Sequence, residues 1–458
     1  MSTRLVVAAL LISLCGCTVG PKYKRPQTNV PGQYRGEATS GGLGPVAFGE
    51  MKWWAVFQDP TLESLIREGL QNNYDIKIAA TRVLQASAVL GIRRADQLPS
   101  VSATAGVENV RNNFFPGSPT FSTANIQASY IVDFWGQYRR ATEAARANLV
   151  ATEFGQNVVR TTLVSDIATA YFQLRQFDAQ LEYANQTLAA DQDMLRINTI
   201  KFKGGESAQT DVLQAQLLVE QAESQVISLK QSIEQTENSI SILLGKNPGP
   251  ITRGLSLMEQ PHLPEIPVGL PSSLLEHRPD VKQAEELLVS ANANVGVAKA
   301  AFFPQLALTG LFGAQSTSLT SFLNGPATVW SVGAQVAQPI YQGGRLRSNY
   351  RLAWEQRDEA ELAYKRTILQ ALGDVSNSLV GYNQSRQFRM KITEQTATYA
   401  EAARLANVRF LGGTTSFLEV LVTQQQYFTS QLALAEAWNL ELQNYVQLYR
   451  ALGGGWEQ

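Results

Sequence analysis

The chain has 458 residues, of which 44% are hydrophobic and 17% are charged, and its formal net charge at pH 7 is −1. This length is enough for two or three domains, and the near-zero charge excludes a strongly basic nucleic-acid-binding protein. Two histidines and two cysteines are too few for a zinc cluster or a disulfide scaffold. No run of about 18 apolar residues predicts a transmembrane helix, so membrane insertion through a β-barrel stays open.

The N-terminus has the pattern of a secreted lipoprotein. Arg4 precedes the apolar run 5–14, which has the length of a signal-peptide core. The run ends in Leu14-Cys15-Gly16-Cys17, and a small residue directly before a cysteine resembles a bacterial lipobox. We expect residues 1–16 to be removed and Cys17 to carry a covalent lipid that holds the protein at the membrane. The alternative is an ordinary secreted protein with two chance cysteines.

Residues 17–60 are expected to form an extended N-terminal strap, because the stretch 18–52 is rich in proline and glycine. Two similar halves follow. Residues 75–99 align with 280–304, and residues 202–245 align with 410–453 in the same order. We therefore expect one domain of two repeats, 61–245 and 272–453. The proline-rich segment 246–271 would be a stiff connector between them, and 454–458 a short tail.

Very long helices are predicted from the distribution of proline, which is absent from residues 120–247 and 340–458. Each repeat should contain one helix, two strands, a long helix and a second long helix. The expected long helices are 137–203, 207–245, 344–411 and 415–452, and 67 helical residues would span about 100 Å. Gly204-Gly205 and Gly412-Gly413 would let the chain reverse between them. A soluble helical rod is the alternative from these features alone.

Four segments alternate between apolar and polar residues, which predicts strands at 100–112, 119–134, 305–315 and 327–341. Their length suits a tilted crossing of a bilayer. Four strands cannot close a barrel, and lipid tolerates no open sheet edge. We therefore expect three chains to pool 12 strands around a pore, with the long helices extending the tube beyond the membrane. The expected fold class is mainly α with membrane β.

Six motifs spread over nearly the whole mature chain carry a family resemblance. They are Cys17-Thr-Val-Gly-Pro-Lys-Tyr-Lys-Arg-Pro26, Trp53-Trp54-x-x-Phe57-x-Asp59-Pro60-x-Leu62, Leu275-Glu-His-Arg-Pro-Asp280, Ala300-Ala-Phe-Phe-Pro304, Gly343-Gly-Arg-Leu-Arg347 and Ala451-Leu-Gly-Gly-Gly-Trp456. The combination resembles the outer membrane factor family of TolC/OprM-like channels, in its lipoprotein branch.

The resemblance implies a homotrimer with a 12-stranded barrel in the outer membrane lipid and a helical tunnel in the periplasm. It implies the exit duct of a tripartite efflux pump for drugs or other small toxic compounds. A periplasmic adaptor and an inner membrane transporter, of the resistance-nodulation-division class, would be its partners. Apart from the lipid on Cys17 no cofactor or metal is expected, and we expect neither an enzyme nor a nucleic-acid partner. A protein-secretion duct of the same fold and a non-conducting structural lipoprotein are the alternatives.

Relatives with this resemblance close their tunnels near the helix reversals, which implies a periplasmic gate at Leu418, Glu419, Val422 and Asp211. Glu419 and Asp211 each lie six residues after a reversal glycine, Gly413 and Gly205. Both acids also suit the N-terminal turn of a helix, where the dipole favours negative charge. The resemblance also implies that the reversals contact the adaptor. These expected contact residues are Lys203, Gly204, Gly205, Leu411, Gly412, Gly413 and Thr414.

Overall fold

The computed structural model describes residues 18–28, 31, 52–109, 111, 120–260, 274–317, 322 and 327–456. Cys17, the leader 1–16, residues 261–271 of the expected connector and the last two residues of the tail lie outside these ranges.

The chain forms two compact units. Unit 1 comprises residues 1–28, 81–153 and 283–366, and unit 2 comprises residues 29–80, 154–282 and 367–458. Each unit takes segments from both sequence halves, so the units do not coincide with the expected repeats 61–245 and 272–453. The physical reason is that strands and helices of one half bury their surfaces against matching elements of the other half.

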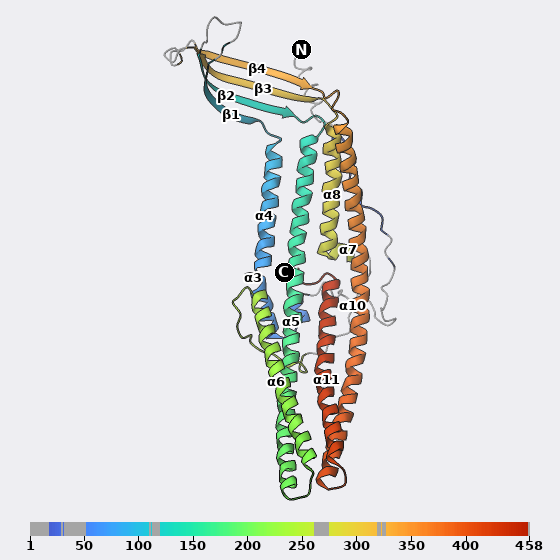
Figure 1. Cartoon of the computed structure of the whole chain (residues 1–458). Helices are drawn as coiled ribbons and strands as arrows, with labels where there is room; N and C mark the ends of the chain where they lie inside the picture. The colour runs from blue at the N-terminus through green and yellow to red at the C-terminus, as the bar shows by residue number, and fades with distance from the viewer. Residues whose placement is uncertain are drawn as a thin grey trace. The chain divides into compact units, whose positions relative to one another are not determined.

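The described residues of unit 1 form one antiparallel sheet in the order β1-β2-β3-β4 (Figure 1). The strands are β1 (Ser100–Asn109), β2 (Thr120–Val132), β3 (Gln305–Ser316) and β4 (Thr328–Ala337). The β2–β3 ladder joins the two sequence halves, with Val132 opposite Leu306. Strand β4 ends before the expected residue 341, because Pro339 has no N–H to donate to a ladder.

One face of this sheet is apolar and exposed. Ala103, Ile126, Phe312 and Trp330 lie opposite one another in one row across the four strands. Because side chains alternate between faces along a strand, Val332, two residues from Trp330, lies on the same face. Trp330 and Val332 are 73% and 81% exposed in the single chain. The face therefore has the pattern of a sheet with an apolar environment on one side.

Residues 18–28 of the strap form hydrogen bonds with the rest of unit 1. The amide of Val19 donates to the carbonyl of Trp135 at 3.0 Å. Tyr23 and Arg25 both donate to the Glu285 carboxylate, at 3.0 and 2.8 Å. A Cβ built on Gly20 would lie 2.5 Å from the Cα of Gly296, so only glycine fits this crossing. The strap therefore has a defined path here.

Two long helix pairs form most of unit 2, together with shorter helices near their ends (Figure 1). The pairs are α5 (Gln137–Lys203) with α6 (Gln209–Leu243), and α10 (Arg345–Leu411) with α11 (Phe417–Ala451). The first segments of α5 and α10 belong to unit 1. The other helices with described bounds are α2 (Trp53–Val56), α3 (Pro60–Asn72) and α7 (Leu274–His277), together with α4 (Tyr74–Ala95) and α8 (Pro279–Ala300), which lie mostly in unit 1.

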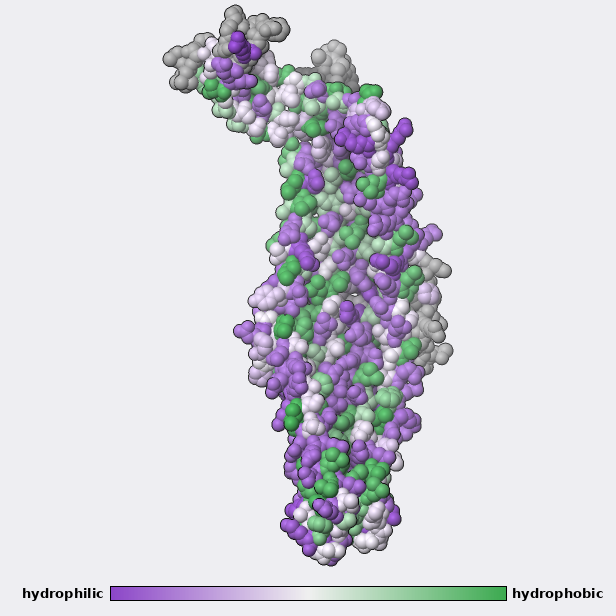
Figure 2. All heavy atoms as spheres, in the orientation of Figure 1, coloured by the Kyte–Doolittle hydropathy of each residue, from purple (hydrophilic) through white to green (hydrophobic). Residues whose placement is uncertain are grey.

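The surface of these helices is mixed in character. On the face shown in Figure 2, hydrophilic residues alternate with scattered hydrophobic ones along the helices. Among the described residues, no helix combines the length and the apolar composition that a membrane span requires.

Two of the motifs that carry the family resemblance contribute polar side chains that form hydrogen bonds and an ion pair within unit 2. Asp59, only 1% exposed, caps α3 by accepting from the amides of Thr61 and Leu62, and it accepts from the Tyr171 hydroxyl at 2.8 Å. Arg278 is also buried and holds the Asp280 carboxylate at 2.6 Å. These polar groups are satisfied in the core, as stability requires.

Candidate gate at the helix reversals

The two helix reversals have the same backbone geometry. Gly205 and Gly413 adopt left-handed φ values of 79° and 73°. The amide of Glu206 donates to the carbonyl of Lys201 at 2.8 Å, and the amide of Thr414 donates to that of Arg409 at 2.9 Å. These are Schellman caps, in which a glycine with positive φ ends the helix without strain. Since the caps use the residues after each glycine, α6 and α11 begin at Gln209 and Phe417, two residues later than expected.

The first and second reversals are held together by an apolar cluster. It consists of the buried side chains of Met194, Ala215, Ala406, Phe410, Phe417 and Val420. The rings of Phe410 and Phe417 have their centroids 5.6 Å apart, and the Lys201 ammonium lies 4.1 Å from the centroid of Phe410. Side chains from α5, α6, α10 and α11 thus meet, and the two hairpins pack against each other close to their reversals.

Glu419 lies in the first turn of α11 and is paired with a cation. The Arg409 guanidinium, at the end of α10, donates to the Glu419 carboxylate at 2.8 Å, and the Thr415 hydroxyl contacts the same carboxylate. Sequence reasoning selected Glu419 and missed Arg409. The positive charge of Arg409 therefore offsets much of the negative charge of Glu419 at any gate formed there. Because the pair is this exposed, it contributes little to the stability of the fold.

Leu418 and Val422 share one face of α11. They are four residues apart, which places them one above the other on a helix, and they are 57% and 42% exposed. Phe417 and Val420, on the other side of the helix, are buried in the apolar cluster. The structure thus brings Leu418 and Val422 together on an open apolar strip beside Glu419.

Asp211 has the corresponding place in the first turn of α6, with a different environment. The Ser207 hydroxyl donates to its carboxylate at 2.7 Å, as Thr415 does to Glu419. The position that corresponds to Arg409, however, is Lys201, whose ammonium lies over the Phe410 ring. The two acids expected at the gate therefore differ in their cationic surroundings.

The expected adaptor-contact residues form the two reversal turns themselves. Lys203, Gly204 and Gly205 are exposed in the first turn, and residues 411–414 are exposed in the second. A Cβ built on Gly205 or on Gly413 would meet nothing within 4 Å. Both turns are thus open to a partner in the single chain.

Comparison with known proteins places these features in a family. The sequence pattern described as outer membrane efflux protein matches residues 65–246 and 270–454. The solvent efflux pump outer membrane protein SrpC of Pseudomonas putida is 33% identical, and the alignment covers 97% of each chain. The cation efflux system protein CusC of Escherichia coli is 31% identical over 99% of each chain.

Solved structures show the same fold. The outer-membrane channel OprN superposes with a TM-score of 0.89 at 27% identity, covering 96% of this chain and all of that one. The open state of the MtrE outer membrane channel of Neisseria gonorrhoeae gives a TM-score of 0.87 at 26% identity, covering 96% of this chain and 99% of that one. The expected fold class is confirmed by these likenesses.

Proposed function

The chain belongs to the outer membrane efflux protein family, and from this premise we propose that it works as the passive exit duct of a tripartite pump. It is an outer membrane efflux channel, not an enzyme. The observation that carries the proposal is the match over 96–97% of the chain, with 33% identity to an efflux pump protein and a TM-score of 0.89 to a channel.

We propose a homotrimer as the conducting unit. Strands β1 and β4 each pair with a single neighbour within the described sheet, and an unpaired edge is not tolerated in lipid. Pairing β4 of one copy with β1 of the next satisfies both edges. Three copies then give 12 strands, with the exposed apolar row from Ala103 to Trp330 facing the outer membrane lipid.

The partners in this proposal meet the channel at the helix reversals. The exposed turns at 203–205 and 411–414 would contact a periplasmic adaptor, which links the channel to an inner membrane transporter of the resistance-nodulation-division class. The open positions of Gly205 and Gly413, where no neighbouring atom lies within 4 Å of a Cβ, support a docking role.

The gate in this proposal is built mainly on α11. Leu418 and Val422 would form an apolar constriction, and Glu419 with Arg409 would set its charge. Asp211 would add a second ring of carboxylates. Because Arg409 balances Glu419, we expect only weak cation selection.

The transported compounds belong to the class of small toxic molecules. The relatives' names include solvent, toluene, antibiotic and cation efflux, so the names alone do not select one class.

A complementation assay tests the function. Cells that lack their own efflux channel should regain tolerance to toluene, a hydrophobic antibiotic or a toxic cation when they express this chain with a matching pump and adaptor. A variant lacking residues 411–414 is the matched control and should not restore tolerance. Recovery of protein secretion without tolerance to any small compound would instead support the secretion duct, and recovery of neither would contradict the proposal.

A further inference from the structure

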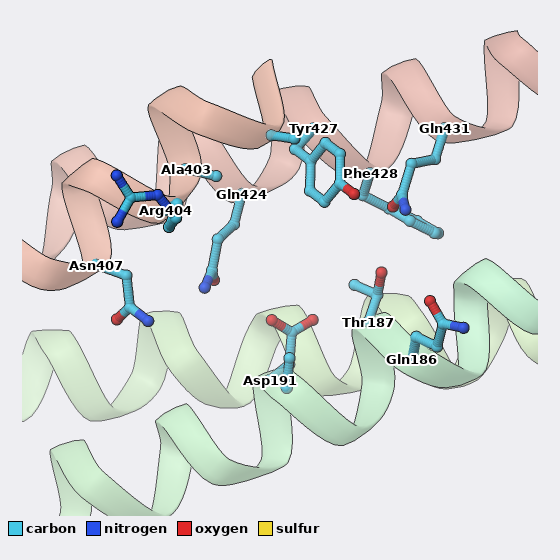
Figure 3. A pocket seen from close by; sticks show the side chains of 12 residues that line it. Gln186, Thr187, Asp191, Ala403, Arg404, Asn407, Gln424, Tyr427, Phe428 and Gln431 are labelled. Atoms are coloured by element: carbon cyan, nitrogen blue, oxygen red, sulfur yellow. The ribbon is translucent and has the colours of Figure 1, made fainter. Parts of the chain in front are cut away.

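Unit 2 contains a cavity of about 310 Å³ between the helix pairs, and Asn407, one of its lining residues, lies four residues before Leu411 at the end of α10. Figure 3 shows side chains from α5 on one side and from α10 and α11 on the other. The lining residues that carry the argument are Asp191, Asn407, Gln424, Tyr427, Phe428 and Arg404. The volume lies at the lower end of the range typical of small-molecule sites.

Asp191 is the unusual group in this cavity. It lies on α5, it is 4% exposed, and its carboxylate points into the space between the helices (Figure 3). Within the part of the chain that the structure describes, Asp191 makes no hydrogen bond or ion pair. Burial raises the pKa of this carboxyl to about 6, since a charge removed from water without a partner is costly.

Two further acceptors at the cavity also lack a donor. The side-chain oxygens of Asn407 and Gln424 are buried, and no hydrogen bond reaches them among the described residues. Buried polar atoms are nearly always satisfied in native proteins. The cavity therefore contains three hydrogen-bond acceptors, one carboxylate and two amide oxygens, that receive no hydrogen bond from the described residues. Water or a ligand must supply the donors.

The charged side chains that line the cavity do not donate hydrogen bonds to these acceptors. Arg404 on α10 is the one charged residue besides Asp191 among those lining the cavity, and both of its bonded nitrogens are held by Glu401, at 2.7 and 2.8 Å. Asp191 also borders a second cavity of about 370 Å³ next to α6, and the α6 and α11 residues that line it are uncharged. No cation of the described chain is therefore directed at Asp191.

The walls identify the class of ligand. Tyr427 and Phe428 present aromatic rings to the cavity, and Ala190, Ala400 and Ala403 leave room beside them. Aromatic faces attract cations, and a carboxylate forms its strongest hydrogen bonds with a charged donor. A bare metal ion would require more ligands, and no cluster of three acidic, histidine or cysteine side chains exists among the described residues.

We propose that this cavity binds a small organic cation, a protonated amine with an apolar body, whose ammonium pairs with Asp191 and whose body lies against Tyr427 and Phe428. The amide oxygens of Asn407 and Gln424 accept the remaining ammonium hydrogens. Binding requires the ionised carboxylate, so affinity falls as the pH drops through the range around 6. The site does not depend on the proposed pump, because it lies within one chain.

The test uses the full-length protein purified in detergent and the probe 4-bromobenzylamine. Calorimetry at pH 7.5 should show binding that 4-bromobenzyl alcohol, the neutral analogue, does not reproduce. Asp191→Asn should weaken the probe tenfold or more, while Asp191→Glu retains binding and confirms an intact fold. Asp166→Asn is the matched control, since Asp166 lies on the same helix and lines a different cavity; it should leave the affinity unchanged.

The bromine atom of the probe allows the binding site to be located directly by diffraction. Anomalous diffraction from soaked crystals should place it between Asp191 and Phe428. Absence of binding, equal binding of the alcohol, an unchanged affinity in Asp191→Asn or a bromine position elsewhere would each overturn the proposal. Complementation of efflux is a separate readout, so the failure of this site and the failure of the pump role can be told apart.

Discussion

The guanidinium of Arg409 and the carboxylate of Glu419 lie 2.8 Å apart across the second helix reversal. They come from the end of α10 and the first turn of α11, so the Schellman cap between them fixes the pair. The cation is close enough to offset the field of the acid that the sequence singled out as a gate residue.

We expect Arg409→Gln to increase the cation preference of the channel, because it uncovers the Glu419 charge. The permeability ratio of cations to anions, measured from reversal potentials in planar bilayers, should rise about twofold, the effect of a few tenths of a kcal/mol at an exposed pair. Glu419→Gln should lower the ratio. Arg196→Gln, which removes an exposed arginine paired with Asp193, is the control and should change nothing; an equal rise there would show a general charge effect.

Arg278→Ala should strongly destabilise unit 2. Arg278 is buried, pairs with Asp280 and Asp374 at 2.6 and 3.1 Å, and donates to the carbonyl of Ala451 at 3.1 Å. Because both carboxylates are partly exposed, the main loss is the buried hydrogen bond to the Ala451 carbonyl, which leaves that carbonyl without its donor and costs about 1–3 kcal/mol. Denaturant unfolding of the helices should show this loss. Arg351→Ala breaks a largely exposed pair with Glu355 and should cost almost nothing; similar losses in both variants would contradict the stabilising role of Arg278.

Gly413→Ala should destabilise the second reversal by about 1–2 kcal/mol, because an alanine is forced into a left-handed conformation. Gly373→Ala is the matched control. Gly373 lies inside α10 with open space around it, so alanine there should stabilise the helix by up to about 1 kcal/mol. Hydrogen exchange in peptides around each glycine measures both effects. Slower exchange near residue 413 in Gly413→Ala would refute the strain.

The buried Asp191 should make unit 2 more stable as the pH falls. Its folded pKa is raised to about 6 from an unfolded value near 3.8. The ionised carboxylate therefore destabilises the fold by about 3 kcal/mol above pH 6, and this penalty disappears progressively between pH 6 and pH 4.

Asp191→Asn should remove the same penalty. The stability gain of the variant should be largest at pH 7.5 and nearly absent at pH 4, as measured by hydrogen exchange around residue 191 with correction for intrinsic rates. A gain that is independent of pH would mean that packing, and not charge, is responsible.

Cys17 should carry the lipid. Cells grown with labelled palmitate should label the wild-type chain, and Cys17→Ala should remove the label. Cys15→Ala should keep the label, since cleavage is expected after Gly16. Label that survives in Cys17→Ala would contradict the lipobox reading.

The long helices were the most predictable part of the fold. Absence of proline and the glycine pairs predicted helix 137–203, and α5 covers the same residues. These signals are local, so the sequence displays them directly. The strand ends were less predictable, because they also depend on the partner strand: the last residue of β4, Ala337, pairs with Gln305, the first residue of β3.

The interactions around the site could be predicted only in part. Asp211 and Glu419 could be selected from the sequence because each lies six residues after a reversal glycine. The Arg409 partner was not, because ten residues and a helix cap separate it from Glu419. No sequence motif singled out Asp191 as a site residue. Its matching position in the second half is Tyr399, and its burial comes from α10 and α11, more than 200 residues away.

Six left-handed glycines fall into three pairs, 136 with 344, 205 with 413 and 245 with 453, each separated by 208 residues. The two halves of the chain therefore share the same backbone conformation at three corresponding turns. In the proposed trimer, six near-equivalent reversals would ring the axis with pseudo-sixfold symmetry. Side chains reduce that symmetry to threefold, because Arg409 neutralises an acid while its counterpart Lys201 lies over an aromatic ring. An adaptor approaching this ring would meet two chemically distinct kinds of site in alternation.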